Sequence, residues 1–214
     1  MTVRRIMNAN PITTTPDASI VDVQQVLKDN KIHRLPVLDR KGALAGVITE
    51  KDILHATPSP VSSLSIYEIP YMLAKLKVSN LMSKPKSVSP DTLVEEAARM
   101  MIEGDLSCLP VVEGGRLIGI VSKSDMFKVL VELCGANEKG VRATVILTER
   151  KGELAKLTGA LTEQGFDIVS MGTVPDSDRK EGVLTIFKVR GDKLDDVLSA
   201  IKPLVREIVD IRLT

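Results

Sequence analysis

Two short motifs in this sequence place an aspartate three positions after a hydroxyl residue. Thr49 and Asp52 form the first motif, and Ser122 and Asp125 form the second. Each follows a glycine-led apolar run and opens a stretch with helical spacing, so each could be a capping box that satisfies free N–H groups at a helix start. Each could also bind a ligand, because a helix N-terminus attracts phosphate and a carboxylate can accept hydrogen bonds from two ribose hydroxyls. One occurrence alone would favour the cap, and the recurrence favours ligand binding.

The motifs recur because a longer segment is written twice. Residues 35–39 match 109–113, and residues 46–52 match 119–125. Each copy is expected to form an extended segment, a helix, a strand, a turn, a second strand and a second helix. A three-stranded unit with two helices leaves one face of its sheet open, so the two copies should pack together as a pseudo-symmetric pair. The Pro-rich segment between them is interpreted as a linker with a short helix over 66–76.

The dipeptide His33-Arg34 lies at a helix-to-strand corner of the first copy, and Ser107-Cys108 occupies the same place in the second. The Arg34 guanidinium could pair with a phosphate, although a solvated charge and a surface imidazole are also typical of such a corner. The two candidate pockets are therefore expected to differ in charge. One would favour a polyphosphate, and the other an uncharged or monoanionic adenosyl group.

The last third of the chain has a different pattern, which predicts a βαββαβ unit of ferredoxin-like type. Strands are expected over 142–147, 167–174, 182–190 and 208–213, and helices over 153–164 and 194–205. The turn after the first strand contains Glu149, Gly152 and Leu154. Its backbone N–H groups could receive a small zwitterion such as an amino acid, but a plain turn with acidic residues near a helix start explains these residues better.

Composition disfavours several functional classes. The chain has 29 basic and 28 acidic residues and only two Tyr, three Phe and no Trp, which argues against nucleic-acid binding. No apolar run is long enough to cross a bilayer, and the first residues lack the apolar core of a signal peptide. Cys108 and Cys134 lie in apolar stretches without a paired spacing and are interpreted as buried thiols of a cytoplasmic protein. No metal-ligand, P-loop or nucleophile pattern occurs, so no enzyme and no metal are expected.

The repeated Leu-Pro-Val-(Leu/Val)-acid segment and the Gly-led ending with Thr/Ser-x-x-Asp resemble the cystathionine-β-synthase (CBS) domain. Residues 1–56 and 76–134 would be a tandem pair, or Bateman module, with an insert over 57–75. After a linker over 135–140, residues 141–214 resemble an ACT domain. The whole layout is similar to that of the acetoin-utilisation proteins of the B type. The implied fold is mixed α+β and α/β, with two CBS repeats and a ferredoxin-like ACT domain.

The CBS resemblance implies two sites, each shared between the repeats. In each site the aspartate would bind the ribose, and the apolar and proline residues would flank the adenine. Arg34 would bind a phosphate. One site would combine Ser122 and Asp125 with Thr15, Ile32, His33, Arg34 and Pro36; the other would combine Thr49 and Asp52 with Ser89, Leu106, Ser107, Cys108 and Pro110.

The expected function is regulatory binding of an adenosine nucleotide (AMP, ADP or ATP) or of S-adenosylmethionine. The expected protein is a homodimer with a possible metabolic enzyme as partner, and without nucleic-acid or membrane partners. The alternative is a dimeric interaction protein that docks an enzyme without binding a nucleotide.

Overall fold

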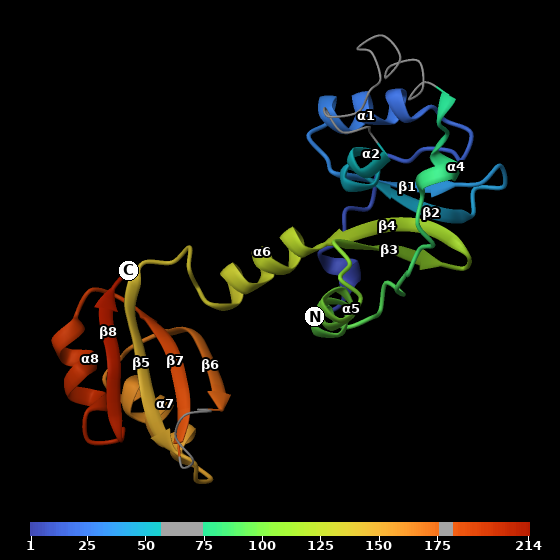
Figure 1. Cartoon of the computed structure of the whole chain (residues 1–214). Helices are drawn as coiled ribbons and strands as arrows, with labels where there is room; N and C mark the ends of the chain where they lie inside the picture. The colour runs from blue at the N-terminus through green and yellow to red at the C-terminus, as the bar shows by residue number, and fades with distance from the viewer. Residues whose placement is uncertain (57–74, 176–181) are drawn as a thin grey trace. The chain divides into compact units, whose positions relative to one another are not determined.

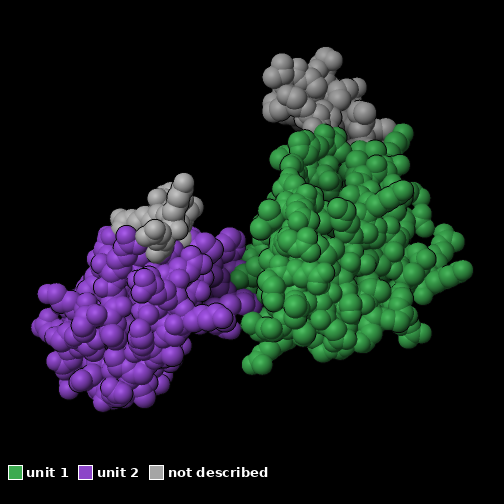
Figure 2. Space-filling model, turned by 90° about the horizontal axis from the view of Figure 1, so that it is seen from below, with its two compact units in different colours: residues 1–126 green, residues 127–214 purple. Residues whose placement is uncertain are grey.

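A computed structural model of the chain describes residues 1–56, 75–175 and 182–214. The chain forms two compact units, residues 1–126 and 127–214 (Figure 2). The short helix expected within 66–76 lies largely outside the described residues, as does the polar loop 176–181. None of the described helices is long and apolar enough to cross a membrane.

The two copies of the repeat have the same element order (Figure 1). The first contains η1 (Val3–Arg5), α1 (Ile20–Asp29), β1 (Arg34–Leu38), β2 (Leu44–Thr49) and α2 (Glu50–Ala56). The second contains α4 (Val78–Leu81), α5 (Val94–Glu103), β3 (Cys108–Glu113), β4 (Arg116–Ser122) and α6 (Lys123–Leu133). The repeat inferred from the sequence is thus confirmed as a structural repeat.

Helices α1 and α5 show why the apolar spacing predicts helices here. Ser19 caps α1, since its Oγ accepts a hydrogen bond from the Val21 N–H at 3.2 Å. The buried residues of α1 are Ile20, Val23 and Leu27, and those of α5 are Val94, Ala97 and Met101, so each helix turns one apolar stripe towards a hairpin.

The two hairpins pair in equivalent registers. Leu35 pairs with Ile48 in the first, and Leu109 pairs with Val121 in the second. The register shifts between Val37 and Leu38 in the first hairpin, and at the matching position of the second. The loops differ between the copies, but the hairpins that carry the candidate site residues do not.

The expected third strand of each copy is reduced to one parallel bridge. Thr14 bridges Val37, and Val88 bridges Val111 in the second copy. Prolines flank both segments, and a proline has no N–H with which to continue a ladder. The predicted extended start of each copy was also wrong in its first residues, which form the helical turns η1 and α4.

These two helical turns are exchanged between the copies. Val3 is fully buried in the core of the second copy, and its N–H donates to the Thr92 carbonyl at 2.9 Å. Val78 is fully buried in the core of the first copy, and its N–H donates to the Ala18 carbonyl at 3.0 Å. The sequence boundary of each repeat therefore differs from the boundary of its hydrophobic core.

The glycines within the second strand of each hairpin, Gly46 in β2 and Gly119 in β4, are explained by this exchange. A Cβ on Gly46 would lie 2.8 Å from Met82 Sδ, and a Cβ on Gly119 would lie 2.7 Å from Met7 Sδ. Such distances are too short for carbon and sulfur, so both strands need glycine where the exchanged segment crosses them.

The second unit contains the predicted βαββαβ order. Its elements are β5 (Gly140–Thr148), α7 (Glu153–Glu163), β6 (Ile168–Pro175), β7 (Gly182–Arg190), α8 (Leu194–Ile201) and β8 (Glu207–Leu213). The strands form one antiparallel sheet in the order β6-β7-β5-β8. Helix α8 ends at Ile201 and not at the predicted residue 205, because Pro203 cannot continue the helical hydrogen bonds. The core is built around Phe187, Leu157 and Leu161.

Candidate functional site

The Thr49–Asp52 motif lies where β2 ends and α2 begins. Asp52 Oδ2 accepts hydrogen bonds from the Thr49 N–H at 2.8 Å and from Thr49 Oγ1 at 2.7 Å, and the Asp52 N–H donates back to Thr49 Oγ1 at 3.2 Å. The capping interpretation is therefore correct for this motif. It leaves room for a ligand, because Asp52 Oδ1 has no hydrogen-bond partner among the residues that the structure describes.

The Ser122–Asp125 motif has the same geometry at the junction of β4 and α6. Asp125 Oδ2 accepts from the Ser122 N–H at 2.9 Å and from Ser122 Oγ at 2.6 Å. Both motifs thus fix the start of a helix and hold a half-buried carboxylate in the same orientation on equivalent elements.

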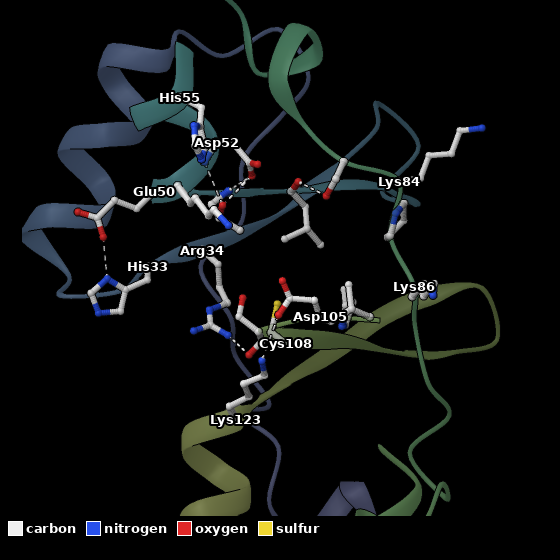
Figure 3. Close-up of a pocket in the computed structure, with 18 residues that line it drawn as sticks. His33, Arg34, Glu50, Asp52, His55, Lys84, Lys86, Asp105, Cys108 and Lys123 are labelled. Carbon is white, nitrogen blue, oxygen red and sulfur yellow. Dashed lines mark hydrogen bonds and ion pairs between the residues drawn. The ribbon is translucent and has the colours of Figure 1, made fainter. Parts of the chain in front are cut away.

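A cavity of about 520 Å³ opens beside Thr49 and Asp52 (Figure 3). It falls in the size range typical of small-molecule sites. Both repeats contribute to its lining, and six of its residues belong to one of the two expected sites: Thr49, Asp52, Leu106, Ser107, Cys108 and Pro110. Ser89 was grouped with them but does not line the cavity; it is exposed, and its Oγ accepts from the Asp91 N–H at 3.3 Å.

Arg34 and His33 line this same cavity, although they were grouped with Ser122 and Asp125. Arg34 is the first residue of β1, and its Nη1 donates to the Ser107 carbonyl of the other repeat (Figure 3). His33 Nδ1 lies 2.8 Å from Glu50 Oε2, and both side chains are mostly exposed. The Arg34 guanidinium therefore reaches across to the Ser107 side, and both dipeptides line one cavity.

Three further residues were expected in the site with Ser122 and Asp125, namely Thr15, Ile32 and Pro36. None of them lines this cavity. Thr15 is exposed, Ile32 packs against the core of the first copy, and Pro36 is buried in β1 opposite Val47.

Cys108 forms part of the cavity wall and is 7% exposed. Burial raises the pKa of its thiol, and the nearby Arg34 guanidinium offsets only part of this effect. Cys108 is thus buried, as predicted. Cys134 is exposed, contrary to the prediction, because it follows the last residue of α6.

Four lysines of the cavity were missed by the sequence reasoning: Lys51, Lys84, Lys86 and Lys123. Lys84 and Lys86 belong to the segment that follows α4, where no periodic pattern marks them. They reach the cavity because Ser83 pairs with Val47 of β2, with backbone hydrogen bonds of 3.0 and 3.1 Å. The lysine-proline-lysine run was the one signal that could have drawn attention to them.

A second hollow, of about 390 Å³, lies at the β5–α7 turn of the second unit. Glu149 and Leu154 line it, while Gly152 does not; Gly152 has φ +93° and precedes the first residue of α7. Thr185 also lines the hollow, and its fully buried Oγ1 has no hydrogen-bond partner among the described residues. The described residues contain no cluster of His, Cys, Asp and Glu that could hold a metal ion.

Comparison with known proteins extends these observations. The family model of the CBS domain matches residues 3–59 and 78–132. The solved CBS domain pair of protein MJ0100, in complex with 5′-methylthioadenosine and S-adenosyl-L-methionine, is 26% identical with a TM-score of 0.52, over 64% of this chain and 98% of that one. CBSX2 of Arabidopsis thaliana in complex with AMP is 29% identical with a TM-score of 0.51, over 61% and 96%.

A solved putative acetoin utilization protein (AcuB) from Vibrio cholerae has the same fold over 64% of this chain and 95% of that chain. It is 23% identical, with a TM-score of 0.53. At this identity, the likeness concerns the fold alone.

Proposed function

This chain belongs to the CBS domain family, and from that premise we propose that it is a regulatory protein that binds an adenosine nucleotide between its two repeats. The observation that carries the proposal is the cavity lined by Thr49 and Asp52 of one repeat and by Leu106, Ser107, Cys108 and Pro110 of the other. Related CBS pairs bind AMP, or S-adenosyl-L-methionine and 5′-methylthioadenosine.

Each part of an adenosine nucleotide has a suitable counterpart in the cavity wall. Asp52 offers a carboxylate oxygen that can accept hydrogen bonds from ribose hydroxyls. Leu106 and Pro110 supply apolar surface for the adenine ring, and Arg34 supplies a guanidinium for phosphate. The equivalent carboxylate of Asp125 would serve a second site.

Ligand binding here can become a signal because the cavity wall contains a contact between the repeats. Arg34 of the first repeat donates to the Ser107 carbonyl of the second. A phosphate that captures Arg34 would bind more tightly to the arrangement in which this contact is broken, and such a difference in affinity is what shifts a conformational equilibrium. The protein so controlled would be a metabolic enzyme, with acetoin utilisation as the proposed context. We further propose a homodimer in the cytoplasm, where the two free cysteines would stay reduced.

For residues 141–214 we propose an ACT domain that receives a small zwitterion at its β5–α7 turn. The 390 Å³ hollow supports this role, as does the Thr185 hydroxyl, which has no hydrogen-bond partner within residues 1–56, 75–175 and 182–214. Thermal unfolding of the chain with each of the common amino acids would test it. A rise in the midpoint with one amino acid, abolished by Thr185→Val, is the expected result, and no rise with any of them would refute it.

The nucleotide proposal is tested by mass spectrometry of small molecules released from the purified chain, followed by thermal unfolding with AMP, ADP, ATP and S-adenosylmethionine. A ligand at a hundred times its dissociation constant adds about 2.7 kcal/mol to the free energy of unfolding. Asp52→Ala should remove the part of this effect that arises at the Asp52 cavity, and Asp125→Ala the part that arises at the second site. An unchanged midpoint with every compound, together with no heat of binding in calorimetry, would refute the proposal.

A second candidate function is an interaction protein that docks an enzyme without a ligand. Helix α6 favours it, because Phe127, Leu130 and Leu133 are large, apolar and exposed. This function predicts that an enzyme copurifies equally with the wild-type chain and with Asp52→Ala. Capture that depends on nucleotide, and is lost in Asp52→Ala, would instead support ligand-controlled regulation.

A further inference from the structure

The cavity beside Asp52 has an excess of positive charge. Five lysine and arginine side chains line it against three acids: Arg34, Lys51, Lys84, Lys86 and Lys123 against Glu50, Asp52 and Asp105. Two of the acids already have partners, since Glu50 contacts His33 at 2.8 Å and Asp105 lies 3.8 Å from Lys123. In the described parts of the chain, Lys51, Lys84 and Lys86 make no ion pair.

Lys84 and Lys86 are held at the cavity by backbone hydrogen bonds. The preceding residue, Ser83, exchanges two backbone hydrogen bonds with Val47, and its Oγ donates to the Val47 carbonyl at 3.2 Å. Val47 is two residues before Thr49 on β2. Figure 3 shows both lysines on the connecting segment, on the side of the cavity opposite to His33 and Glu50.

The pseudo-symmetry of the repeats gives an internal comparison. The bridge between Val47 and Ser83 has its counterpart in the bridge between Ile120 and Asn8. Counting from this bridge, Ala9 stands where the other copy has Lys84, and Pro11 stands where it has Lys86. The two lysines are therefore particular to the cavity beside Asp52, and its counterpart beside Asp125 has no cation at these positions.

Building on the nucleotide-binding function proposed above, we propose that the cavity beside Asp52 selects adenosine di- and triphosphates, with Lys84 and Lys86 receiving the outer phosphates. Ammonium groups bind phosphate through charge-assisted hydrogen bonds. The interaction with an anionic ligand is most favourable for a cation that has no counter-ion in the protein. S-Adenosylmethionine carries a positive sulfonium and is repelled by the same charges. The Ser107–Cys108 side of the pair is thus the polyphosphate side, because Arg34 and the two lysines all line its cavity.

Isothermal titration calorimetry of the full chain with ATP, AMP, adenosine and S-adenosylmethionine tests this selectivity. We expect ATP to bind at least about tenfold more tightly than adenosine or S-adenosylmethionine at about 0.1 M salt, and this advantage to shrink at about 0.5 M salt as the charges are screened. The double variant Lys84→Ala/Lys86→Ala should weaken ATP binding by about tenfold and leave adenosine binding within about twofold.

The double variant Lys41→Ala/Lys202→Ala is the matched control, since it also removes two exposed lysines that line none of the cavities described above. It should bind ATP like the wild type. Equal affinities for ATP, adenosine and S-adenosylmethionine would overturn the selectivity while leaving the nucleotide-binding function intact. Unchanged ATP affinity in Lys84→Ala/Lys86→Ala would overturn the role of the lysines. No binding of any adenosine compound would refute the proposed function itself, and the selectivity with it.

Discussion

Replacing Asp52 or Asp125 by alanine separates the helix-capping role of the repeated motif from its proposed role in ligand binding. Asp52→Ala removes the hydrogen bonds of 2.8 and 2.7 Å that Oδ2 accepts at the start of α2. Asp125→Ala removes the equivalent bonds of 2.9 and 2.6 Å at the start of α6. Loss of such a capping side chain costs about 1 kcal/mol. Each variant should therefore unfold about 4 °C below the wild type.

The two variants should differ in their response to nucleotide. The 520 Å³ cavity lies beside Asp52, whereas Asp125 does not line it. Removing the carboxylate from a ribose costs at least about 1.5 kcal/mol, or more than about tenfold in affinity. ATP should accordingly stop stabilising Asp52→Ala at concentrations that still stabilise Asp125→Ala.

Thermal unfolding of the wild type and both variants, over a series of ATP concentrations, checks both statements. Asp125→Ala acts as the control for the loss of a cap, because its geometry matches that of Asp52. An identical loss of the ATP response in the two variants would refute the assignment of the ligand to the Asp52 cavity. A large difference between their midpoints without ligand would refute the equivalence of the two caps.

Three further predictions concern other parts of the chain. A thiol reagent near neutral pH should modify the exposed Cys134 before Cys108, because burial raises the pKa of the Cys108 thiol and keeps it protonated. The rate of Cys108 modification should rise with pH. Equal rates for the two cysteines by mass spectrometry would contradict this. Val78→Ala should lower the free energy of unfolding, measured with a denaturant, by about 2 kcal/mol, because Val78 is fully buried. Val21→Ala, at a half-exposed position, should lower it by less than about 0.5 kcal/mol. Equal losses would exclude a core role for Val78. Thr185→Val should leave the free energy of unfolding unchanged or raise it by up to about 1 kcal/mol, since the hydroxyl has no hydrogen-bond partner in the described part of the chain. A loss of stability would contradict this.

The local elements were largely predictable, because their signals lie within a few residues of each other. Helix α1 follows from its apolar spacing, and β7 (Gly182–Arg190) has the predicted bounds. The helical turns η1 and α4 were not predictable. Val3 is held by the Thr92 carbonyl, 89 residues away in the sequence, and no local pattern encodes a contact of that range.

Among the charged residues that line the candidate site, Asp52 and Arg34 were predicted from the sequence, but none of the lysines was. Thr49 and Asp52 are visible because the motif recurs. Their grouping with Ser89, Leu106, Ser107, Cys108 and Pro110 followed from the CBS resemblance and not from spacing. Arg34 was assigned to the other site because the direction of its side chain depends on tertiary packing. Lys84 and Lys86 reach the cavity through a single backbone pairing with Val47, which periodicity cannot predict.

The exchange of helical turns has a consequence for synthesis on the ribosome. Val3 is made 89 residues before Thr92, yet its N–H donates to the Thr92 carbonyl. At the usual 5 to 20 residues per second, the apolar Val3 side chain waits roughly 5 to 20 s for its partner. The first copy likewise cannot close its core until Val78 has been made. The nascent chain must therefore carry an unfinished first half until much of the second has emerged, and the two copies complete their folding together.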